Sequence, residues 1–351
     1  MREVTISLPQ YREFWTRLRH NLASPDTQLM AVVKANAYGL GAIPLSTFLQ
    51  TEGLVNYLGV ATVPEAIALR NAHIALPILV LSHPEPETLS SLLSYNLEQV
   101  VYTANAILEL QALAESHHAQ IQVHLKIDTG MGRAGCLPAQ AATLVDLIQT
   151  SPNLHLKGVC THFACADEPE SEFTQTQLQT FLDTLAPLHL SPQIIRHAAN
   201  SAATQYFPDT HLDMIRIGMD SYLTIATLKT QVQSVKTVGA NTPISYGSTY
   251  HTPAATQIAV LDIGYADGIP RSFMGEVLIH EKRYPVVGRV CMDMMMVNVG
   301  QDPIQTGDEA VLFGHQGQAH ISLEEFSAHA HRIPYESLCT LGDRVTRHYQ
   351  V

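Results

Sequence analysis

The sequence predicts an α/β protein: a closed barrel of eight parallel strands with helices between them, followed by a smaller, mainly β domain. Between residues 28 and 217, short apolar runs alternate eight times with segments of helical periodicity. Several runs are unbroken and rich in valine and isoleucine, which is typical of parallel strands covered on both faces by helices. After about residue 225 the helical periodicity gives way to short strand-like runs separated by glycine, proline and aspartate.

The apolar runs of the barrel lie at residues 29–33, 57–61, 78–81, 99–102, 121–127, 154–160, 193–196 and 212–217. Amphipathic segments separate them; in one of these, Ala141, Leu144, Val145 and Ile148 share a helical face. Eight such repeats favour a closed (β/α)8 barrel, and an open doubly wound sheet is the alternative arrangement of the same pattern.

The second domain is expected to contain six strands and one helix. The strands lie at residues 232–238, 256–263, 277–279, 286–290, 294–299 and 309–313, and the helix at 323–329. These assignments place the barrel domain at residues 1–225 and the mainly β domain at residues 226–351. The first ten or so residues are candidates for joining the β domain.

The composition excludes several classes of function. The 351 residues are 46% apolar, enough for a large core, and carry a net charge of −12. A chain this acidic has no general attraction to nucleic acid or to an anionic membrane, and no apolar run approaches the roughly 18 residues of a membrane-spanning helix. The five cysteines form no CxxC pair, and residues 1–22 contain no secretory pattern. A cytoplasmic protein with free thiols is therefore expected.

Polar residues end five of the eight predicted strands. In a barrel of this kind the carboxyl ends of the strands form one face, where the chemistry takes place. The residues at this face are Lys34, Asp128 with Arg133 beyond it, His162, Asn200 with Ser201, and Arg216 with Gly218. Each alone is also explained as a solvated strand end, whereas their convergence on one face favours a site.

Two lysines occupy unusual positions. Lys34 lies at the tip of a buried strand, where partial burial lowers the pKa of its amine and prepares it to attack an aldehyde. The alternative for Lys34 is an ammonium group that reaches water. Lys126 shares one face of its strand with Gln122 and His124, and apolar residues occupy the other face. A buried Lys126 needs a partner or a chemical change that removes its charge.

The 18 histidines do not indicate a metal centre. The segment from His280 to Tyr284 falls short of an HExxH motif, and His329 and His331 do not share a helical face. The sequence also contains no GxSxG nucleophile motif and no pair of acids placed for glycoside hydrolysis. No metal site is predicted.

Residues 31–39, Ala-Val-Val-Lys-Ala-Asn-Ala-Tyr-Gly, resemble the cofactor-lysine motif of the alanine racemase family. Eight further blocks match this family in its order, at residues 126–133, 161–164, 199–202, 216–218, 245–250, 264–268, 288–293 and 333–336. Nine blocks in order make the resemblance highly specific. Departures from the family pattern follow Gly218, where Met219 to Leu223 replace a usual Leu-Tyr-Gly, and occur at Met294–Met296.

The resemblance implies a (β/α)8 TIM-type barrel with a β-rich C-terminal domain, and pyridoxal 5′-phosphate (PLP) held on Lys34 as an internal Schiff base. It implies two bases that exchange the Cα proton, Lys34 on the D-side and Tyr246 on the L-side. A free tyrosine has a pKa of about 10 and is a weak base at neutral pH. In the family, this tyrosine is supported by the residues that match Arg216 and His162.

Further site residues follow from the same resemblance. Arg216 is placed at the pyridine nitrogen and keeps it unprotonated, because arginine does not give up its proton. Arg133 is placed at the phenolic oxygen and the substrate carboxylate. Lys126 matches a lysine that some members carry as a carbamate, an anion that would pair with Arg133. The other cofactor-binding positions are Tyr38, His162, Asn200, Ser201, Gly218, Met219 and Tyr335.

The resemblance also implies a homodimer with active sites shared between subunits. Tyr246, Tyr265 and Met292 match residues that reach the active site of a second subunit. Met292 matches a substrate-binding position and Asp293 a supporting one. Tyr265 and Tyr335 narrow the mouth of the site, which favours the methyl group of alanine.

The implied reaction is the interconversion of L-alanine and D-alanine, which supplies D-alanine for peptidoglycan. Three alternatives are retained. The first is a racemase of serine or of broader specificity. The second is a fold-type-III amino-acid decarboxylase, which Arg216 disfavours because such enzymes place an acid at that position. The third is a non-catalytic PLP carrier, which the presence of a β domain with Tyr246 disfavours.

Overall fold

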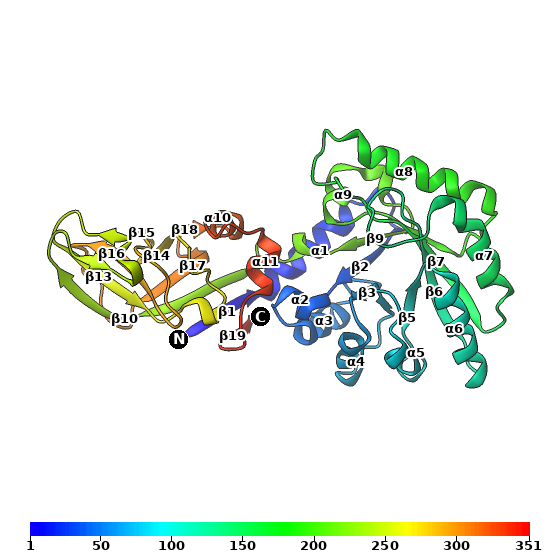
Figure 1. Cartoon of the computed structure of the whole chain (residues 1–351), viewed down its shortest axis with the longest axis horizontal. Coiled ribbons are helices and arrows are strands. Elements are labelled where there is room, and N and C mark those ends of the chain that lie inside the picture. The colour runs from blue at the N-terminus through cyan, green and yellow to red at the C-terminus, as the bar shows by residue number, and fades with distance from the viewer. The chain divides into compact units, whose positions relative to one another are not determined.

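The computed structural model describes residues 1–351, and the chain divides into two compact units (Figure 1). The barrel unit comprises Phe14–Ala37 and Ala42–Asp220. The β unit comprises Met1–Glu13, Tyr38–Gly41 and Ser221–Val351. No helix combines the length and the apolar character that crossing a membrane requires.

The barrel unit is built on eight parallel strands in the order β8-β7-β6-β5-β4-β3-β2-β9. The strands are β2 (Gln28–Val32), β3 (Tyr57–Val60), β4 (Ile78–Val80), β5 (Glu98–Val101), β6 (Ile121–Lys126), β7 (Leu154–Cys160), β8 (Ile195–His197) and β9 (Met214–Ile217). Backbone bonds join the two outer strands, from Asp213 N–H to the Arg196 carbonyl at 3.0 Å and from Arg216 N–H to the Ala199 carbonyl at 3.1 Å. The sheet is therefore nearly closed, and the predicted (β/α)8 barrel is confirmed, with all eight strands where the apolar runs placed them.

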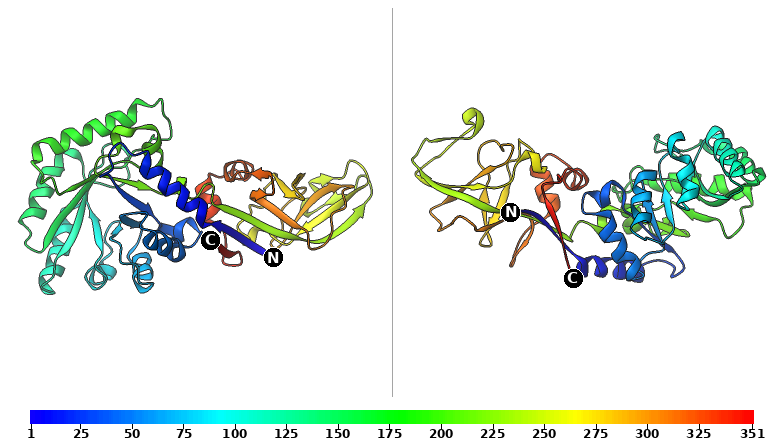
Figure 2. Two further views of the ribbon diagram at one scale, coloured as in Figure 1. Left: turned by 180° about the vertical axis from the view of Figure 1, so that it is seen from behind. Right: turned by 90° about the horizontal axis from the view of Figure 1, so that it is seen from below.

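Helices lie outside these strands in every view (Figures 1 and 2). They are α3 (Ala42–Thr51), α4 (Val63–Asn71), α5 (Leu89–Ser94), α6 (Ala104–Ser116), α7 (Ala141–Thr150), α8 (Glu172–Leu185) and α9 (Ser201–Tyr206), and the long helix α1 (Leu8–His20) precedes β2. Helix α7 buries the four residues that share its apolar face, Ala141, Leu144, Val145 and Ile148. This periodicity explains why the segment packs as a helix against the barrel.

The β unit contains a nine-stranded sheet that includes both ends of the chain. Its main path is β15-β14-β17-β10-β1-β19, while β13 pairs with β10 and β16, and β18 pairs with β17. The strands are β1 (Arg2–Ser7), β10 (Ala226–Val238), β13 (Thr256–Leu261), β14 (Glu276–Ile279), β15 (Lys282–Pro285), β16 (Met295–Gly300), β17 (Glu309–Gln316), β18 (Ala319–Ile321) and β19 (Thr346–Gln350). A separate hairpin joins β11 (Pro243–Ile244) to β12 (Tyr250–His251), and two helices, α10 (Leu323–His329) and α11 (Pro334–Cys339), complete the unit.

The structure differs from the sequence prediction at several points of the β unit. The expected strand at 286–290 is reduced to one bridge between Val286 and Val297. Gly288 ends it, since its φ of +70° is outside the β region and a Cβ there would lie 2.8 Å from the Ile244 carbonyl oxygen. The sequence did not predict helix α11, the short strands β11, β12, β15 and β18, or the terminal strands β1 and β19. Strands β1 and β19 run side by side in parallel.

Candidate active site

Lys34 begins a left-handed turn at the carboxyl end of β2. The four residues after it, Ala35 to Tyr38, all have positive φ, between 51° and 55°. This conformation costs a non-glycine residue roughly 1–2 kcal/mol, so the surroundings must hold it. The Ala37 N–H donates to the Val33 carbonyl at 2.8 Å, and the Asn36 side chain accepts from the Ala42 N–H at 2.9 Å. The half-buried Lys34 is therefore presented by a strained and well-anchored backbone.

Glu65 on α4 provides the strongest anchor of this turn. One carboxylate oxygen accepts the N–H of Ala35 at 2.7 Å, and the other accepts the N–H groups of Ala61 at 2.7 Å and Thr62 at 3.2 Å. One side chain thus ties the residue after Lys34 to the end of the neighbouring strand β3.

Four cations surround His162, at the carboxyl end of β7. Burial lowers the pKa of His162 to about 2, and repulsion by nearby positive charges adds to the effect. In decreasing order of effect these charges belong to Arg216, Arg133, Lys126 and Lys34. The imidazole is therefore neutral, and the face that the sequence predicted does bring these residues together. In a chain of net charge −12, this is a local positive site suited to an anion.

The guanidinium of Arg216 is buried and held from three sides. Nη1 contacts Nδ1 of His197 at 3.0 Å, and Nη2 donates to the carbonyls of Thr161 and Ala198, both at 2.8 Å. Nη2 also lies 3.3 Å from Nδ1 of His162. Burial lowers the pKa of Arg216, but an arginine side chain remains charged in proteins.

Lys126 points into the barrel, as the alternation along β6 suggested. Burial lowers the pKa of its amine; Cys160 and Asp128 oppose this shift, and Arg216 and Arg133 strengthen it. Asp128 is occupied by the loop that follows it. Its Oδ1 accepts from Gly130 N–H at 2.9 Å, and its Oδ2 accepts from Arg133 N–H at 3.1 Å. The loop that carries Arg133 is therefore shaped by a carboxylate.

Four further predicted residues follow strands β8 and β9. The side chain of Asn200 accepts the Ala203 N–H at 2.9 Å and caps α9. The buried hydroxyl of Ser201 accepts the N–H of Gly218 at 3.0 Å. Met219 follows Gly218 and begins the short 3-10 turn η5 (Met219–Ser221). The Ser201 hydroxyl therefore lies beside the backbone of Gly218, at the carboxyl end of β9.

The β unit carries the other predicted residues. Tyr38 packs between two aromatic rings, with centroid distances of 5.2 Å to Tyr222 and 5.9 Å to Tyr335. Tyr246 is the most exposed tyrosine of the unit, at 64%, and begins the turn η6 (Tyr246–Ser248). Tyr265, which begins the turn η7 (Tyr265–Asp267), and Met292 are also exposed.

Backbone hydrogen bonds join the loop that carries Tyr265 to the loop that carries Met292. Tyr265 N–H donates to the Cys291 carbonyl and Ala266 N–H to the Met292 carbonyl, both at 3.0 Å. A Cβ at Gly264 would lie 2.4 Å from each of these carbonyl oxygens, so the approach requires glycine.

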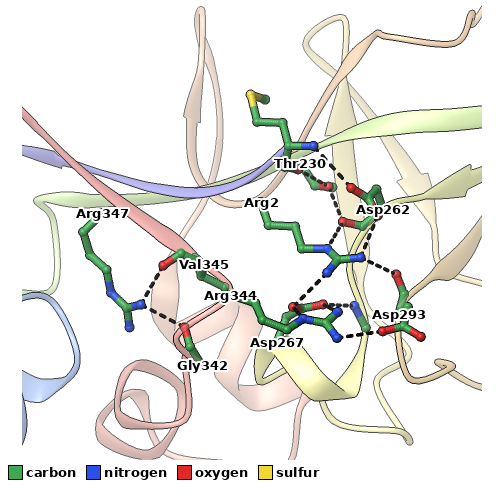
Figure 3. A network of polar contacts seen from close by, with 11 residues as sticks. Arg2, Thr230, Asp262, Asp267, Asp293, Gly342, Arg344, Val345 and Arg347 are labelled. Carbon is green, nitrogen blue, oxygen red and sulfur yellow. Dashed lines mark hydrogen bonds and ion pairs between the residues drawn. The ribbon is translucent and has the colours of Figure 1, made fainter.

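An ion network beneath the loops fixes them (Figure 3). Buried Asp267 accepts from Arg344 Nε at 2.8 Å and lies 3.5 Å from Arg2 Nη1. Arg344 also reaches Asp293 at 2.8 Å, and Arg2 reaches Asp262 at 2.7 Å. Asp293 therefore acts in this structure as part of the support of the loop next to Met292.

Comparison with known families gives a match over nearly the whole chain. A model described as "Alanine racemase, N-terminal domain" matches residues 6–225, and one described as "Alanine racemase, C-terminal domain" matches residues 225–349. The chain belongs to the alanine racemase family. Its activity is accordingly that of a racemase, and the resemblance found in the nine sequence blocks is confirmed.

Individual alanine racemases resemble the chain over their full length. The alanine racemase of Symbiobacterium thermophilum is 41% identical over 345 residues, which cover 93% of this chain and 91% of that protein. That of Desulforamulus reducens is 38% identical over 359 residues, covering 95% and 96%. The crystal structure of the alanine racemase from D-cycloserine producing Streptomyces lavendulae matches with a TM-score of 0.93 at 36% identity, covering 100% of this chain and 97% of that one.

Four residues of the barrel that support the predicted ones, directly or through a neighbouring residue, were not singled out from sequence. Glu65 carried a signal, because a glutamate three residues after Thr62 forms a capping box. His124 carried one too, since it shares a strand face with Lys126. His197 and Glu98 carried none, because each lies within a strand and meets its partners only through the barrel.

Proposed function

We propose that the chain interconverts L-alanine and D-alanine with PLP held covalently by Lys34. The observation that carries this proposal is the position of Arg216, whose Nη2 lies 3.3 Å from Nδ1 of His162. The charges of Arg133, Lys126 and Lys34 also act on this ring and keep it neutral. The cofactor has a phosphate and a phenolic oxygen, and the substrate has a carboxylate, so all three bring negative charge. The donor set of the barrel fits them.

The cofactor-binding residues are proposed from the family resemblance, and the contacts described above support the proposal. For the phosphate we propose the hydroxyl of Ser201, the backbone of Gly218 and Met219, and the tyrosines Tyr38 and Tyr335. Backbone N–H groups and hydroxyls hold a dianion without much added positive charge. For the phenolic oxygen and the substrate carboxylate we propose Arg133, which Lys126 would support as an anionic carbamate. Asn200 and His162 complete the surroundings of the ring.

Arg216 is proposed to donate to the pyridine nitrogen. The contacts of Arg216 use one N–H on Nη1 and those on Nη2, which leaves the Nε–H and a second Nη1–H for a ligand. A donor that cannot lose its proton keeps the ring nitrogen as an acceptor. This weakens the electron demand of the ring and suits a racemase that must avoid side reactions.

The proton transfers are assigned to two residues of this chain. When bound, PLP supplies an electron sink that makes the Cα proton of the attached amino acid acidic. We propose that Lys34 Nζ exchanges this proton on the D-side and that the Tyr246 hydroxyl exchanges it on the L-side. Removal on one side and return on the other inverts the centre.

We further propose a homodimer in which Tyr246, Tyr265 and Met292 serve the active site of the second subunit. Their exposure supports this, because large apolar side chains left in water are typical of interaction surfaces. A hybrid test is direct. K34A and Y246F homodimers each lack one base at every site, but a mixed dimer contains one complete site. Mixing with subunit exchange is expected to restore roughly a quarter of wild-type activity, and no recovery would contradict shared sites.

The cellular role is proposed to be the supply of D-alanine for peptidoglycan in the cytoplasm. The structure contains no disulfide bond, which supports a reducing compartment. Tyr265 and Tyr335, proposed at the mouth of the site, favour alanine over larger substrates.

The function is tested by incubating the protein with PLP and L-alanine while optical rotation and carbon dioxide are followed. Loss of rotation without gas is the expected result. Gas release would indicate a decarboxylase, and the absence of both a PLP carrier. The same assay with L-serine measures the preference for alanine.

A further inference from the structure

A chain of buried hydrogen bonds runs from Arg216 through the interior of the barrel. Arg216 Nη1 lies 3.0 Å from His197 Nδ1, His197 Nε2 lies 2.9 Å from His124 Nδ1, and His124 Nε2 lies 2.8 Å from Glu98 Oε2. The two histidines are fully buried, and Arg216 and Glu98 are each 7% exposed. The chain links strands β9, β8, β6 and β5 and joins a buried cation to a buried carboxylate.

The direction of every bond in this chain follows from its first member. Arginine has five N–H donors and no acceptor, so His197 Nδ1 must accept and carries no proton. His197 then holds its proton on Nε2 and donates it to His124 Nδ1. His124 in turn holds its proton on Nε2 and donates it to the carboxylate of Glu98. Both histidines are neutral, because a second proton on either ring would place two donors against each other.

The packing of β7 makes room for this arrangement. Gly158 is the neighbour of His124 across the β6–β7 pair. A Cβ at residue 158 would lie 2.3 Å from His124 Nδ1, the atom that accepts the bond from His197. The φ of Gly158 is not in the left-handed region, so its lack of a side chain serves space alone. Any larger residue would displace the His124 ring.

The charges along the chain are consistent with this direction. Burial lowers the pKa of His197, and repulsion by Arg216 adds to the effect. Glu98 also accepts at its other oxygen from the Tyr57 hydroxyl at 3.4 Å. Arg70 is a second cation that interacts electrostatically with Glu98, and its guanidinium is bound to backbone carbonyls. Glu98 is thus the anion that faces Arg216 across two neutral rings.

We propose that Glu98 is a positioning residue for Arg216, which it orients and compensates in charge through the fixed chain His124–His197. Only one part of this proposal rests on the proposed function: the remaining N–H groups of Arg216 would then be held in place to bind the cofactor. The chain itself is a property of the folded protein and is observable without turnover.

The test uses full-length protein labelled with ¹⁵N-histidine and solid-state NMR at pH 7. H124Q and H197Q assign the signals. H155Q, at an exposed position near the start of β7, serves as the control. The expected spectrum has both histidines neutral, with the proton on Nε2, and a nitrogen–nitrogen coupling across the His197–His124 bond. A cationic ring, or a proton on Nδ1 of either residue, would overturn the proposal.

Three variants separate the hydrogen bond from the packing. In E98Q the amide oxygen still accepts from His124, so the coupling is expected to persist. In E98L the acceptor is lost, and in G158A the ring is displaced; both are expected to lose the coupling. Loss of the outer contacts of metal ligands typically costs about 10–100-fold. We expect a fall of the same order in kcat/KM for E98L and G158A, and a smaller fall for E98Q.

These readouts distinguish the two proposals. If the NMR pattern is present but the protein does not racemise alanine, the hydrogen-bond chain from Arg216 to Glu98 is confirmed and the proposed function is wrong. If E98L loses the coupling yet keeps the wild-type kcat/KM, Glu98 does not position Arg216. Should E98L not fold, G158A decides the same question with all four members of the chain intact.

Discussion

The carboxylate of Glu65 accepts a hydrogen bond from the N–H of Ala35, the residue directly after Lys34, at 2.7 Å. Its second oxygen holds two N–H groups at the end of β3. The position of the proposed cofactor lysine is therefore set by a side chain from a helix 31 residues further along the chain. Four residues in the left-handed conformation are kept in place by this contact and the backbone bonds beside it.

The first prediction concerns this anchor. Replacing Glu65→Ala leaves three backbone N–H groups without their acceptor, and we expect the free energy of unfolding to fall by about 1–3 kcal/mol. The affinity for PLP should fall with it, because the turn that presents Lys34 loosens. Urea unfolding and PLP titration measure both effects. The control is E87A, which changes an exposed glutamate; equal behaviour of the two variants would contradict the assignment.

The second prediction concerns pH and His162. Its folded pKa is about 2, against about 6.5 in the unfolded chain. The stability that it contributes is complete above pH 6.5 and is lost as the pH falls, because only the unfolded state takes up the proton. In cofactor-free protein, H162Q should flatten the loss of stability between pH 6 and 4 by up to about 1.4 kcal/mol per pH unit. H155Q serves as the control. If the free energy of unfolding of H162Q changes with pH as steeply as that of H155Q, His162 is not buried among cations.

The third prediction concerns the network beneath the loops of Tyr265 and Met292. Asp267 is fully buried between Arg344 and Arg2 (Figure 3). D267A removes the buried acceptor of both arginines and of the Gly264 N–H, so we expect a loss of about 1–3 kcal/mol in chemical unfolding. D262N, at a more exposed carboxylate, should cost less. D267A with wild-type stability would contradict a supporting role for this network.

The fold was largely predictable because its periodicities are local. The eight strands are apolar runs, and α7 has a continuous apolar face. Each of these elements can therefore be predicted from a few neighbouring residues. The strands β1 and β19 are different. They are short and only partly buried. Each pairs with a strand far away in the sequence: β1 pairs with β10 and β19, and β19 pairs with β1.

The site was predictable only in part, for the same reason. Residues that end strands, such as Lys34 and Arg216, could be found because a barrel brings strand ends together. The left-handed turn at Ala35 could not, since no local preference of alanine or asparagine demands it over four residues. The link from Arg216 to Glu98 could not either, because it depends on which side chains meet inside a closed sheet.

The fourth prediction concerns the proposed base of the L-side. Y246F removes the hydroxyl but keeps the ring, and because Tyr246 is exposed we expect the variant to fold as the wild-type protein does. We expect exchange of the Cα proton of L-alanine with deuterated water to fall by at least about 100-fold, within the usual contribution of a general base, while exchange from D-alanine persists. The measurement is NMR of each enantiomer. Normal racemisation by Y246F would rule out the two-base assignment.

The proposed function depends most on the covalent attachment of PLP to Lys34. Reductive trapping measures this attachment directly. The protein is incubated with PLP, reduced with borohydride, digested and mapped by mass spectrometry, with K34A and K126A as matched variants. We predict a pyridoxyl group on Lys34 in the wild-type protein and in K126A, and none in K34A. Labelling of another lysine, or no labelling of Lys34, would contradict the account.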